Sequence, residues 1–397
     1  MTIFSSFWSS ISVLLAVLVA IFLAYPQPEL NWDEFVLPMA RTHVNAVQAD
    51  DPQPLRGKVV LVTGATNGIG LELVRSFVKL GAQVFGHGRS EKKLAALKEE
   101  LPMIQTVRAD LANLDEVADM GNDLLRRRDE INKIDVLINN AGIHQGIGLA
   151  VMLGQVNFST PQDFDKVFAT NYLSHFLLTE KLAPLLSNSS DPTIIQMSST
   201  FHWAVDGSDL MPEAFNVAPV AARPGGSHGF YIFRSQRSYA NSKLAQIYHA
   251  RALQKRHPTL SRARAISVCP AWVGTNIAGT ENSLTYLFLK TFAFPVNGWA
   301  QASAFTALFS REISGDYLTN TKAFDPFLSL IRNYMPSWGY QVGLRDALMF
   351  VHAFAVGLYI QRFAAVAGSS LSSPESFNET ITNALYDWSY RAVERYL

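Results

Sequence analysis

The segment TGATNGIG, residues 63 to 70, constrains the fold of this chain more than any other feature. It follows a short β-branched run, KVVLVTG at 58–64, and it opens an amphipathic stretch with helical spacing. Its three glycines permit a tight turn and let backbone N–H groups approach a pyrophosphate at the helix N-terminus. A lone glycine triplet is a weak signal, but its position between a strand and a helix predicts a dinucleotide-binding loop.

Strand-like and helical patterns alternate along the chain after this loop. The further β-branched runs lie at 82–88, 104–110, 134–140, 193–199 and 264–270. Helical patterns lie at 68–81, 90–101, 114–131, 160–186 and 242–257. The apolar runs are too continuous for strands with one face in water, so they suit a parallel sheet covered on both faces. The pattern predicts an α/β fold with a Rossmann-type doubly wound parallel sheet in a single catalytic domain.

The domain organisation that we expect has four parts. An N-terminal membrane anchor at 1–25 and a Pro-containing acidic linker or collar at 26–56 precede the catalytic domain at 57–322. That domain carries an irregular Pro/Gly-rich insertion at 201–238. A C-terminal extension at 323–397 holds an apolar helix at 347–360 and a terminal helix. The apolar helix is shorter than a membrane span, which favours packing or interfacial contact.

The N-terminal segment has no charged residue in its first 24 positions and reaches the length of a bilayer span. A cleaved secretory signal is the alternative, but no basic residue precedes the apolar run and no clear cleavage site follows it. We therefore expect a single-pass anchor in the lipid bilayer of the endoplasmic reticulum or another endomembrane. The side of the membrane stays open, and Asn188 and Asn378 would be glycosylated only in a lumen.

Composition excludes several classes of protein. The chain has 397 residues, 48% of them hydrophobic, and a formal net charge of zero, so we expect no nucleic-acid partner. Cys269 is the single cysteine, which excludes an intrachain disulfide and a cysteine zinc cluster, and we expect no metal.

The end of the second expected strand indicates the type of dinucleotide. A carboxylate at this position would bind a ribose 2′-hydroxyl, but the sequence GHGRS offers Arg89 and no acid. An arginine forms charge-assisted hydrogen bonds to a phosphate, so Arg89 favours NADP(H) over NAD(H).

Several motifs in order make the chain resemble the classical branch of the short-chain dehydrogenase/reductase family, over about 57–317. They are the T-G-x-x-x-G-x-G spacing, NNAG at 139–142, RADL at 108–111 and YANSK at 239–243. ATNYLSHFLLTEKLAPLL and YANSKLA are similar to the retinol-dehydrogenase-like subgroup. The resemblance implies a catalytic tetrad of Asn171, Ser199, Tyr239 and Lys243, with Ser199 preferred to Ser198. It implies cofactor contacts at Gly64, Thr66, Asn67, Gly68, Ile69, Gly70, Arg89, Asp110, Leu111, Asn140, Ala141, Gly142, Tyr239, Lys243, Pro270 and Thr275.

The chemistry of these residue types supports that implication. Reduction of a carbonyl by hydride leaves an alkoxide that needs a proton, and a tyrosine can supply it if its pKa is lowered. We expect Lys243 and the oxidised nicotinamide to lower the pKa of Tyr239. Ser199 can hydrogen-bond the carbonyl oxygen as charge develops, and Asn171 would connect Lys243 to a water relay. In CPAWVGT, Ala271 replaces the family's usual glycine, whereas Pro270 and Thr275 keep its spacing.

The expected substrate is a hydrophobic small molecule such as a retinoid, a steroid or a fatty aldehyde. The resemblance implies this class, and the apolar segment 283–296, in the place of the family's substrate loop, is consistent with it. A homodimer stays open. Two alternatives to an alcohol/carbonyl oxidoreductase also stay open: a non-catalytic NADP-binding scaffold, and a double-bond reductase similar to protochlorophyllide reductase.

Overall fold

A computed structural model of the chain describes most of the expected catalytic domain. The described residues are 51–127, 130–144, 159–211, 231–270, 273, 275, 277, 308, 317–319, 368–370 and 372–397. The expected anchor at 1–25, most of the linker, the apolar segment 283–296 and the apolar helix 347–360 lie outside them. Across the described ranges, no helix has the length and hydropathy needed to cross a bilayer.

The core of the fold is an eight-stranded sheet of order β3-β2-β1-β4-β5-β6-β7-β8. The first six strands confirm the six that the sequence predicts, with ends shifted by at most two residues. The last two strands, of three residues each, come from segments with no strand pattern. All neighbouring pairs are parallel except β7 with β8. The strands are β1 Val59–Val62, β2 Gln83–Gly88, β3 Gln105–Arg108, β4 Val136–Asn139, β5 Thr193–Met197, β6 Arg264–Cys269, β7 Tyr317–Thr319 and β8 Gly368–Ser370.

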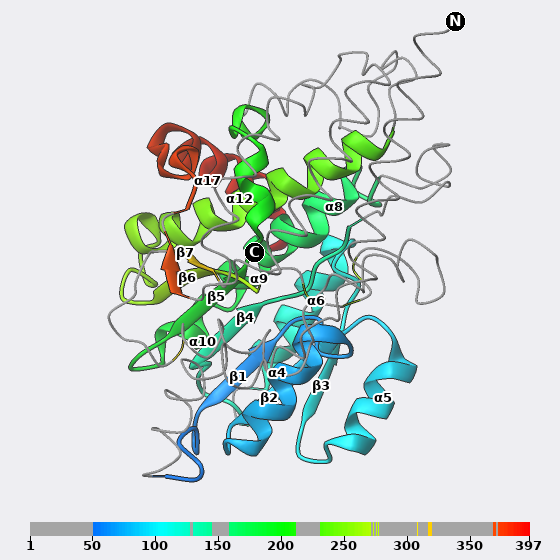
Figure 1. The fold of residues 1–397 in the computed structure, drawn as a ribbon. Helices are drawn as coiled ribbons and strands as arrows, with labels where there is room; N and C mark the ends of the chain where they lie inside the picture. Colours follow the sequence, from blue (N-terminus) through cyan, green and yellow to red (C-terminus); the bar gives the residue numbers. More distant parts are fainter. Residues whose placement is uncertain are drawn as a thin grey trace, which may run out of the picture.

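Helices cover both faces of this sheet, as the continuous apolar runs predict (Figure 1). Val60 and Val62 of β1 pack with residues of α4 and α5, whereas Val59 and Leu61 pack with residues of α6, α9 and α12. Alternate residues of one buried strand therefore serve two apolar layers. These helices are α4 Gly68–Lys79, α5 Glu91–Glu100, α6 Leu114–Arg126, α9 Ser174–Lys181 and α12 Tyr231–Arg256.

The long helix expected at 160–186 is divided into short elements. α8 at Lys166–Phe168 runs into a π-helical turn, η1, at Ala169–Leu173, and α9 and α10 at Ala183–Ser187 follow. Asp165 caps the start of α8 by accepting a hydrogen bond from the Phe168 amide at 2.9 Å. A single π-helical turn inside a helix is a frequent mark of a functional site, and Asn171 lies in this one.

The expected irregular insertion at 201–238 is only partly irregular. It holds two short 3-10 turns, η2 at Thr200–Ala204 and η3 at Ser208–Leu210, but α12 already begins at Tyr231. The eight residues 231–238 are therefore helical, which corrects the sequence expectation. No glycine or proline interrupts the chain between 231 and 256, so a helix can extend that far back. Tyr239 consequently lies in the helix interior and not in its first turn.

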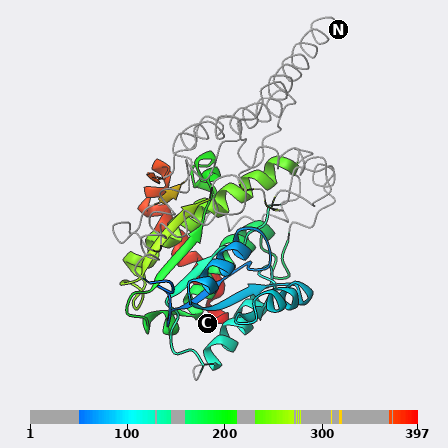
Figure 2. The ribbon, with the colours of Figure 1, turned by 60° about the horizontal axis from the view of Figure 1, so that its bottom comes forward.

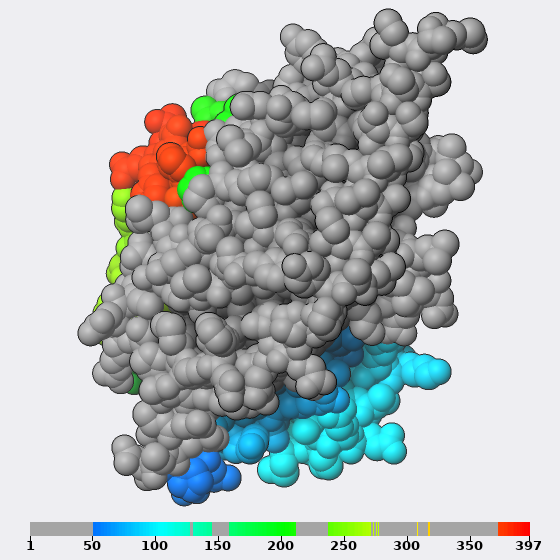
Figure 3. All heavy atoms as spheres, in the orientation of Figure 1, coloured from blue at the N-terminus to red at the C-terminus, as the bar shows by residue number. Residues whose placement is uncertain are grey.

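The C-terminal segment packs on the same body. α17, at Glu379–Val393, lies beside α12 (Figure 1, Figure 2), and β8 extends the sheet. In the space-filling view, the C-terminal residues (red) lie at one end of the molecule, and the first strands and helices (blue and cyan) lie at the other (Figure 3). Buried and half-buried hydrogen bonds are among those that tie α17 to the helix layer. The Tyr172 and Ser389 hydroxyls lie 2.8 Å apart, and the Tyr386 hydroxyl donates to Glu180 at 3.0 Å.

Candidate active site

The glycine-rich loop forms a turn that only glycine fits. Gly64 and Gly68 have φ angles of +69° and +57°, in the left-handed region that L side chains disfavour. A Cβ added at Gly70 would lie 2.2 Å from the Gly64 carbonyl oxygen. Asn67 caps α4, with its Oδ1 accepting from the Gly68 amide at 2.8 Å, and Thr275 lies directly against Gly68. The loop therefore presents a small, backbone-lined surface at the N-terminus of a twelve-residue helix.

The NNAG turn after β4 is joined to this loop through Thr63. The Thr63 hydroxyl accepts hydrogen bonds from the amides of Asn140 and Ala141, both at 2.9 Å. The Asn140 side chain donates to the Thr63 carbonyl at 2.7 Å. Gly142, the last residue of the motif, approaches Lys243 and Asn171, because an added Cβ would lie 3.4 Å from the lysine Nζ. The loop, the turn and the lysine thus belong to one site.

His87 is a buried residue of this loop region that the sequence analysis did not select. Its Nδ1 accepts from the Gly64 amide at 3.2 Å, and its Nε2–H donates to the Ala109 carbonyl at 3.0 Å. Burial lowers the pKa of His87 to about 4, so the imidazole is neutral at physiological pH. The letters GHG contain this histidine, but only the fold shows that it links the loop to β3.

Arg89 and Asp110 lie at the carboxyl ends of β2 and β3, as the motifs predict. Arg89 is exposed, and among the described residues no acid pairs with it. Asp110 Oδ1 accepts from the Ala112 amide at 3.0 Å, and Leu111 is buried beneath it. The exposed Arg89 guanidinium lies at the strand end that GHGRS indicates, and its binding of a phosphate stays a prediction. The remaining expected cofactor residues also lie at this edge: Thr66 touches Gly88, Ile69 packs against the core, and Pro270 ends β6.

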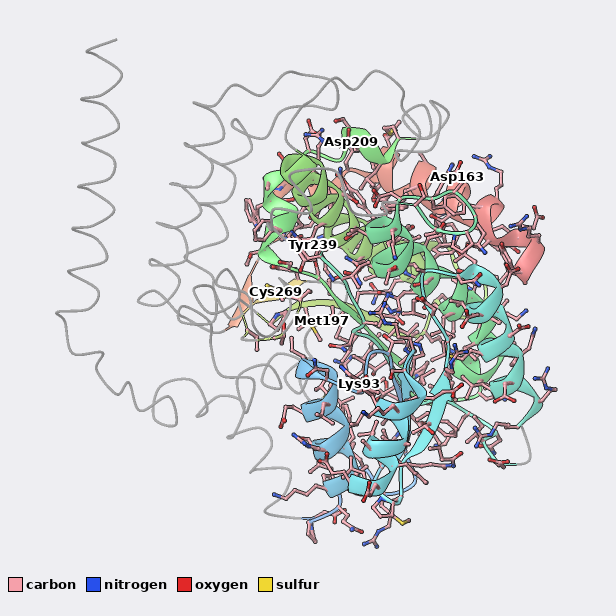
Figure 4. The ribbon with its side chains drawn as sticks, turned by 90° about the vertical axis from the view of Figure 1, so that its right-hand side faces the viewer. Lys93, Asp163, Met197, Asp209, Tyr239 and Cys269 are labelled. Carbon is pink, nitrogen blue, oxygen red and sulfur yellow. The ribbon has the colours of Figure 1, made fainter. Side chains whose placement is uncertain are left out.

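Tyr239 and Lys243 lie one turn apart in α12, with the lysine Nζ 5.4 Å from the centre of the phenol ring. Lys243 is buried, and its Nζ donates to the Met197 carbonyl at 2.7 Å and to Gln246 Oε1 at 3.0 Å. Burial lowers the pKa of Lys243 to about 7. Tyr239 and Met197 lie in one region of the molecule, near Cys269 (Figure 4).

The pKa of Tyr239 shows the opposite shift to the one expected from the sequence. Burial raises it above the ordinary tyrosine value, and the hydrogen bond to Ser199 offsets only part of that rise. Without the cofactor, Lys243 does not lower the pKa of Tyr239 as expected. Burial lowers the pKa of the lysine itself, so only part of it is charged at neutral pH. The rings of His144 and Phe201 meet the phenol edge to face, at 5.0 and 5.8 Å between ring centres.

The two serines after β5 have different surroundings. Ser199 is half-buried and hydrogen-bonds Tyr239. Ser198 is buried, and its hydroxyl donates to the Lys243 main-chain carbonyl at 2.8 Å. The geometry therefore agrees with the choice of Ser199 as the residue that faces the reacting group.

Asn171 is held by the NNAG turn and by α12. Its Oδ1 accepts from the Ile143 amide at 2.8 Å, and its Nδ2 donates to Ser242 Oγ at 3.0 Å. Its main-chain carbonyl accepts from Gln246 Nε2 and from His175 Nδ1, both at 2.9 Å. In the described residues the Gln246 side chain connects Lys243 with the Asn171 main chain, and the water relay expected at Asn171 stays a prediction. The sequence analysis selected neither Gln246 nor His175, and no motif identifies them.

Comparison with known proteins agrees with this architecture. Residues 58–204 match a family model described as short chain dehydrogenase. The chain is 31% identical to oxidoreductase calI of Penicillium decumbens over 211 residues. This match covers 50% of this chain and 54% of that protein. It is 29% identical over 296 residues to human retinol dehydrogenase 14, covering 67% of this chain and 78% of that protein. The chain thus spans about half the length of calI and 78% of the length of the retinol dehydrogenase.

A solved structure shows the same fold. The Pseudomonas aeruginosa RhlG/NADP active-site complex is 20% identical, has a TM-score of 0.50, and covers 68% of this chain and 97% of that one. The sheet and its loop define an α/β protein of the Rossmann type. Residues 58–204 are similar to the short chain dehydrogenase family, and retinol dehydrogenases 13 and 14 are among the proteins similar to this chain.

Proposed function

We propose that this protein is a membrane-associated oxidoreductase that transfers a hydride between NADP(H) and a lipophilic alcohol or carbonyl compound. One observation carries the proposal. Tyr239 is hydrogen-bonded to Ser199 and has Lys243 one turn away, at the edge of the sheet where the glycine-rich loop lies. This places an acid/base, a hydrogen-bond donor and a cation beside a backbone surface suited to a pyrophosphate.

The residues present fit a dinucleotide with a 2′-phosphate. The left-handed glycines and the missing Cβ at Gly70 leave room for a pyrophosphate against the α4 N-terminus. The exposed Arg89 at the end of β2 would bind the 2′-phosphate, and an acid that would repel it is absent from that position. The cofactor supplies or accepts the hydride when bound. The residues that would hold it are Gly64, Thr66, Asn67, Gly68, Ile69, Gly70, Arg89, Asp110, Leu111, Asn140, Ala141, Gly142, Tyr239, Lys243, Pro270 and Thr275.

The side chains of the site divide the proton chemistry among them. In carbonyl reduction the Tyr239 phenol donates its proton to the oxygen that gains negative charge, and in alcohol oxidation the phenolate accepts it back. Ser199 donates a hydrogen bond to the same oxygen. Lys243, in its charged form, stabilises the phenolate that remains. Because Lys243 has a pKa of about 7, modest changes around it shift its charge near neutral pH.

The lipophilic substrate is proposed from the surroundings of Tyr239 and from the relatives. The rings of Phe201 and His144 flank the phenol, which gives the described side of the site an aromatic wall. Retinol dehydrogenase 14 is named for a long-chain isoprenoid alcohol. The uncharged N-terminal segment 1–25 is proposed as the anchor that keeps the catalytic domain, 57–322, next to lipid-dissolved substrates.

Turnover of a panel of lipid carbonyls tests the proposal. The full chain in detergent is supplied with retinaldehyde, a long-chain aldehyde and a ketosteroid, each with NADPH and with NADH. We expect NADPH-dependent reduction of at least one compound and a loss of at least about 100-fold in kcat for Tyr239→Phe. Tyr248→Phe is the matched control, because Tyr248 lies on the same helix with its hydroxyl on the Glu375 carbonyl.

Three results would contradict the proposal. Full activity of Tyr239→Phe would remove the acid/base role. NADPH binding without turnover of any compound would indicate a non-catalytic scaffold, and reduction confined to conjugated carbon–carbon double bonds would indicate a double-bond reductase.

A further inference from the structure

A buried glutamine lies between Lys243 and the π-helical turn that carries Asn171. Gln246 is fully buried on α12, one turn after Lys243. Its Oε1 accepts from Lys243 Nζ at 3.0 Å, and its Nε2 donates to the Asn171 carbonyl at 2.9 Å. Both ends of the amide are therefore used, one on the catalytic lysine and one on the neighbouring helix.

The Asn171 carbonyl has no capacity left for another strong partner. It accepts from Gln246 and also from His175 Nδ1, and a carbonyl oxygen has two lone pairs. His175 Nε2 lies 2.9 Å from the Thr63 hydroxyl, which continues the chain to the glycine-rich loop. Burial lowers the pKa of His175 to about 3, so the ring stays neutral and keeps this arrangement of donors and acceptors.

We propose that Gln246 is a positioning residue of the site, which fixes Lys243 to the Asn171 turn and favours its charged form against the effect of burial. An amide accepts at oxygen and donates at nitrogen, so it orients the lysine without relaying its proton. Gln246 thus joins the ammonium of Lys243 to the main chain of the Asn171 turn through one side chain. This inference rests on the proposed function, in which the charged lysine stabilises the Tyr239 phenolate.

The other groups that act on Lys243 come from three elements. Tyr239 lies on the same helix, Cys269 on β6 and His175 on α9, and the electrostatic effects between Lys243 and the last two are small beside burial. The Met197 carbonyl of β5 is the second acceptor of the ammonium. Gln246 is therefore the side-chain contact of Lys243 whose hydrogen-bonding capacity can be changed without placing a variant on a reacting group.

Two substitutions of Gln246 give opposite predictions. In Gln246→Met the lysine loses an acceptor, so the alkaline limb of the pH profile of kcat/KM for reduction moves down by about one pH unit. At the pH of the wild-type limb this lowers kcat about fivefold and leaves KM for NADPH within about twofold. In Gln246→Glu a carboxylate contacts the ammonium, so the limb moves up by about one unit or more.

Gln196→Met is the matched control. Gln196 is also a fully buried glutamine, but its amide contacts His249 and not Lys243. We expect Gln196→Met to lower stability as Gln246→Met does and to leave the pH profile in place. Equal pH profiles for the two Met variants, or shifts of the same sign for Gln246→Met and Gln246→Glu, would overturn the inference.

A second measurement separates this inference from the proposed function. The pH dependence of the unfolding free energy reports the titration of Lys243 without any turnover. If the wild-type enzyme reduces no carbonyl, the proposed function fails, and the Lys243 titration still shows whether Gln246 controls it. If the wild type is active and Gln246→Met leaves both the pH profile and the Lys243 titration unchanged, the inference alone fails.

Discussion

Burial of Lys243 makes the free energy of unfolding rise as the pH increases above 7. Its pKa is about 7 in the folded protein, against an ordinary lysine value of about 10.4 that the unfolded chain will have. Between these values the unfolded state binds one more proton than the folded state. The free energy of unfolding therefore rises with pH, by up to about 1.4 kcal/mol per pH unit from this lysine alone. From pH 7 to pH 9, where the folded lysine passes from half to fully deprotonated, the rise is about 2 kcal/mol.

The assay is urea unfolding of the protein without cofactor at pH 7, 8 and 9, compared with Lys243→Met. The variant keeps a side chain of similar length and has no titrating group, so the other ionisations contribute equally to both proteins. The difference between the two pH slopes isolates Lys243. We expect the wild type to gain about 2 kcal/mol more than the variant between pH 7 and pH 9.

Parallel slopes for the two proteins would refute this reasoning, because they would mean that the folded lysine titrates at its ordinary pKa. A wild-type stability that falls relative to the variant as pH rises would mean that the lysine is stabilised in its charged form. Either result would also remove the premise that Lys243 is a weakened cation until the cofactor is bound.

Three further predictions concern the loop and the buried histidines. Acidification from pH 6.5 to 4 should lower the free energy of unfolding, because His175 binds a proton in the unfolded chain but not in the folded protein. In urea unfolding, a His175→Phe variant should show a smaller decrease over the same pH range. Gly70→Ala should abolish the thermal shift that NADPH produces, because its Cβ would meet the Gly64 carbonyl. Gly57→Ala should lower the melting temperature with and without NADPH, because Gly57 has a φ of +78°, but it should keep the shift, because its Cβ would meet no other atom. Arg89→Ala should weaken NADPH binding about tenfold or more in a fluorescence titration and leave NADH binding unchanged.

The parts of the fold that rest on local signals were predictable. The six longer strands lie in β-branched runs, and the strand, glycine loop and helix follow one another in the sequence, so periodicity and turn chemistry identify them. β7 and β8 have three residues each, which is too short for any period, and they form because β6 offers an unpaired edge. The helical start of α12 at Tyr231 was missed because glycine and proline just before it marked the whole segment as irregular.

The residues of the site also divide into those that a sequence motif identifies and those that only the fold brings together. Tyr239, Lys243 and the loop glycines lie in motifs whose spacing is fixed along the chain. Gln246 and His175 look like ordinary residues of amphipathic helices. Their roles depend on contacts between segments 75 or more residues apart, which are Gln246 with Asn171 and His175 with Thr63. In the protein without cofactor the pKa of Tyr239 is raised and not lowered, because burial of the phenol and of its lysine partner is a property of the packed core.

The hydrogen bond between Tyr172 and Ser389 sets a condition on how the protein is made. It joins residues separated by 217 positions, and Tyr172 directly follows Asn171. On a ribosome that adds about 5 to 20 residues per second, roughly 10 to 40 seconds pass between the synthesis of these two residues. During that interval the residues that contact the glycine-rich loop have been synthesised. The apolar faces of α9 and α12 are not yet covered by α17. The packing of Tyr172 against Ser389, beside Asn171, is therefore complete only after α17 has been synthesised.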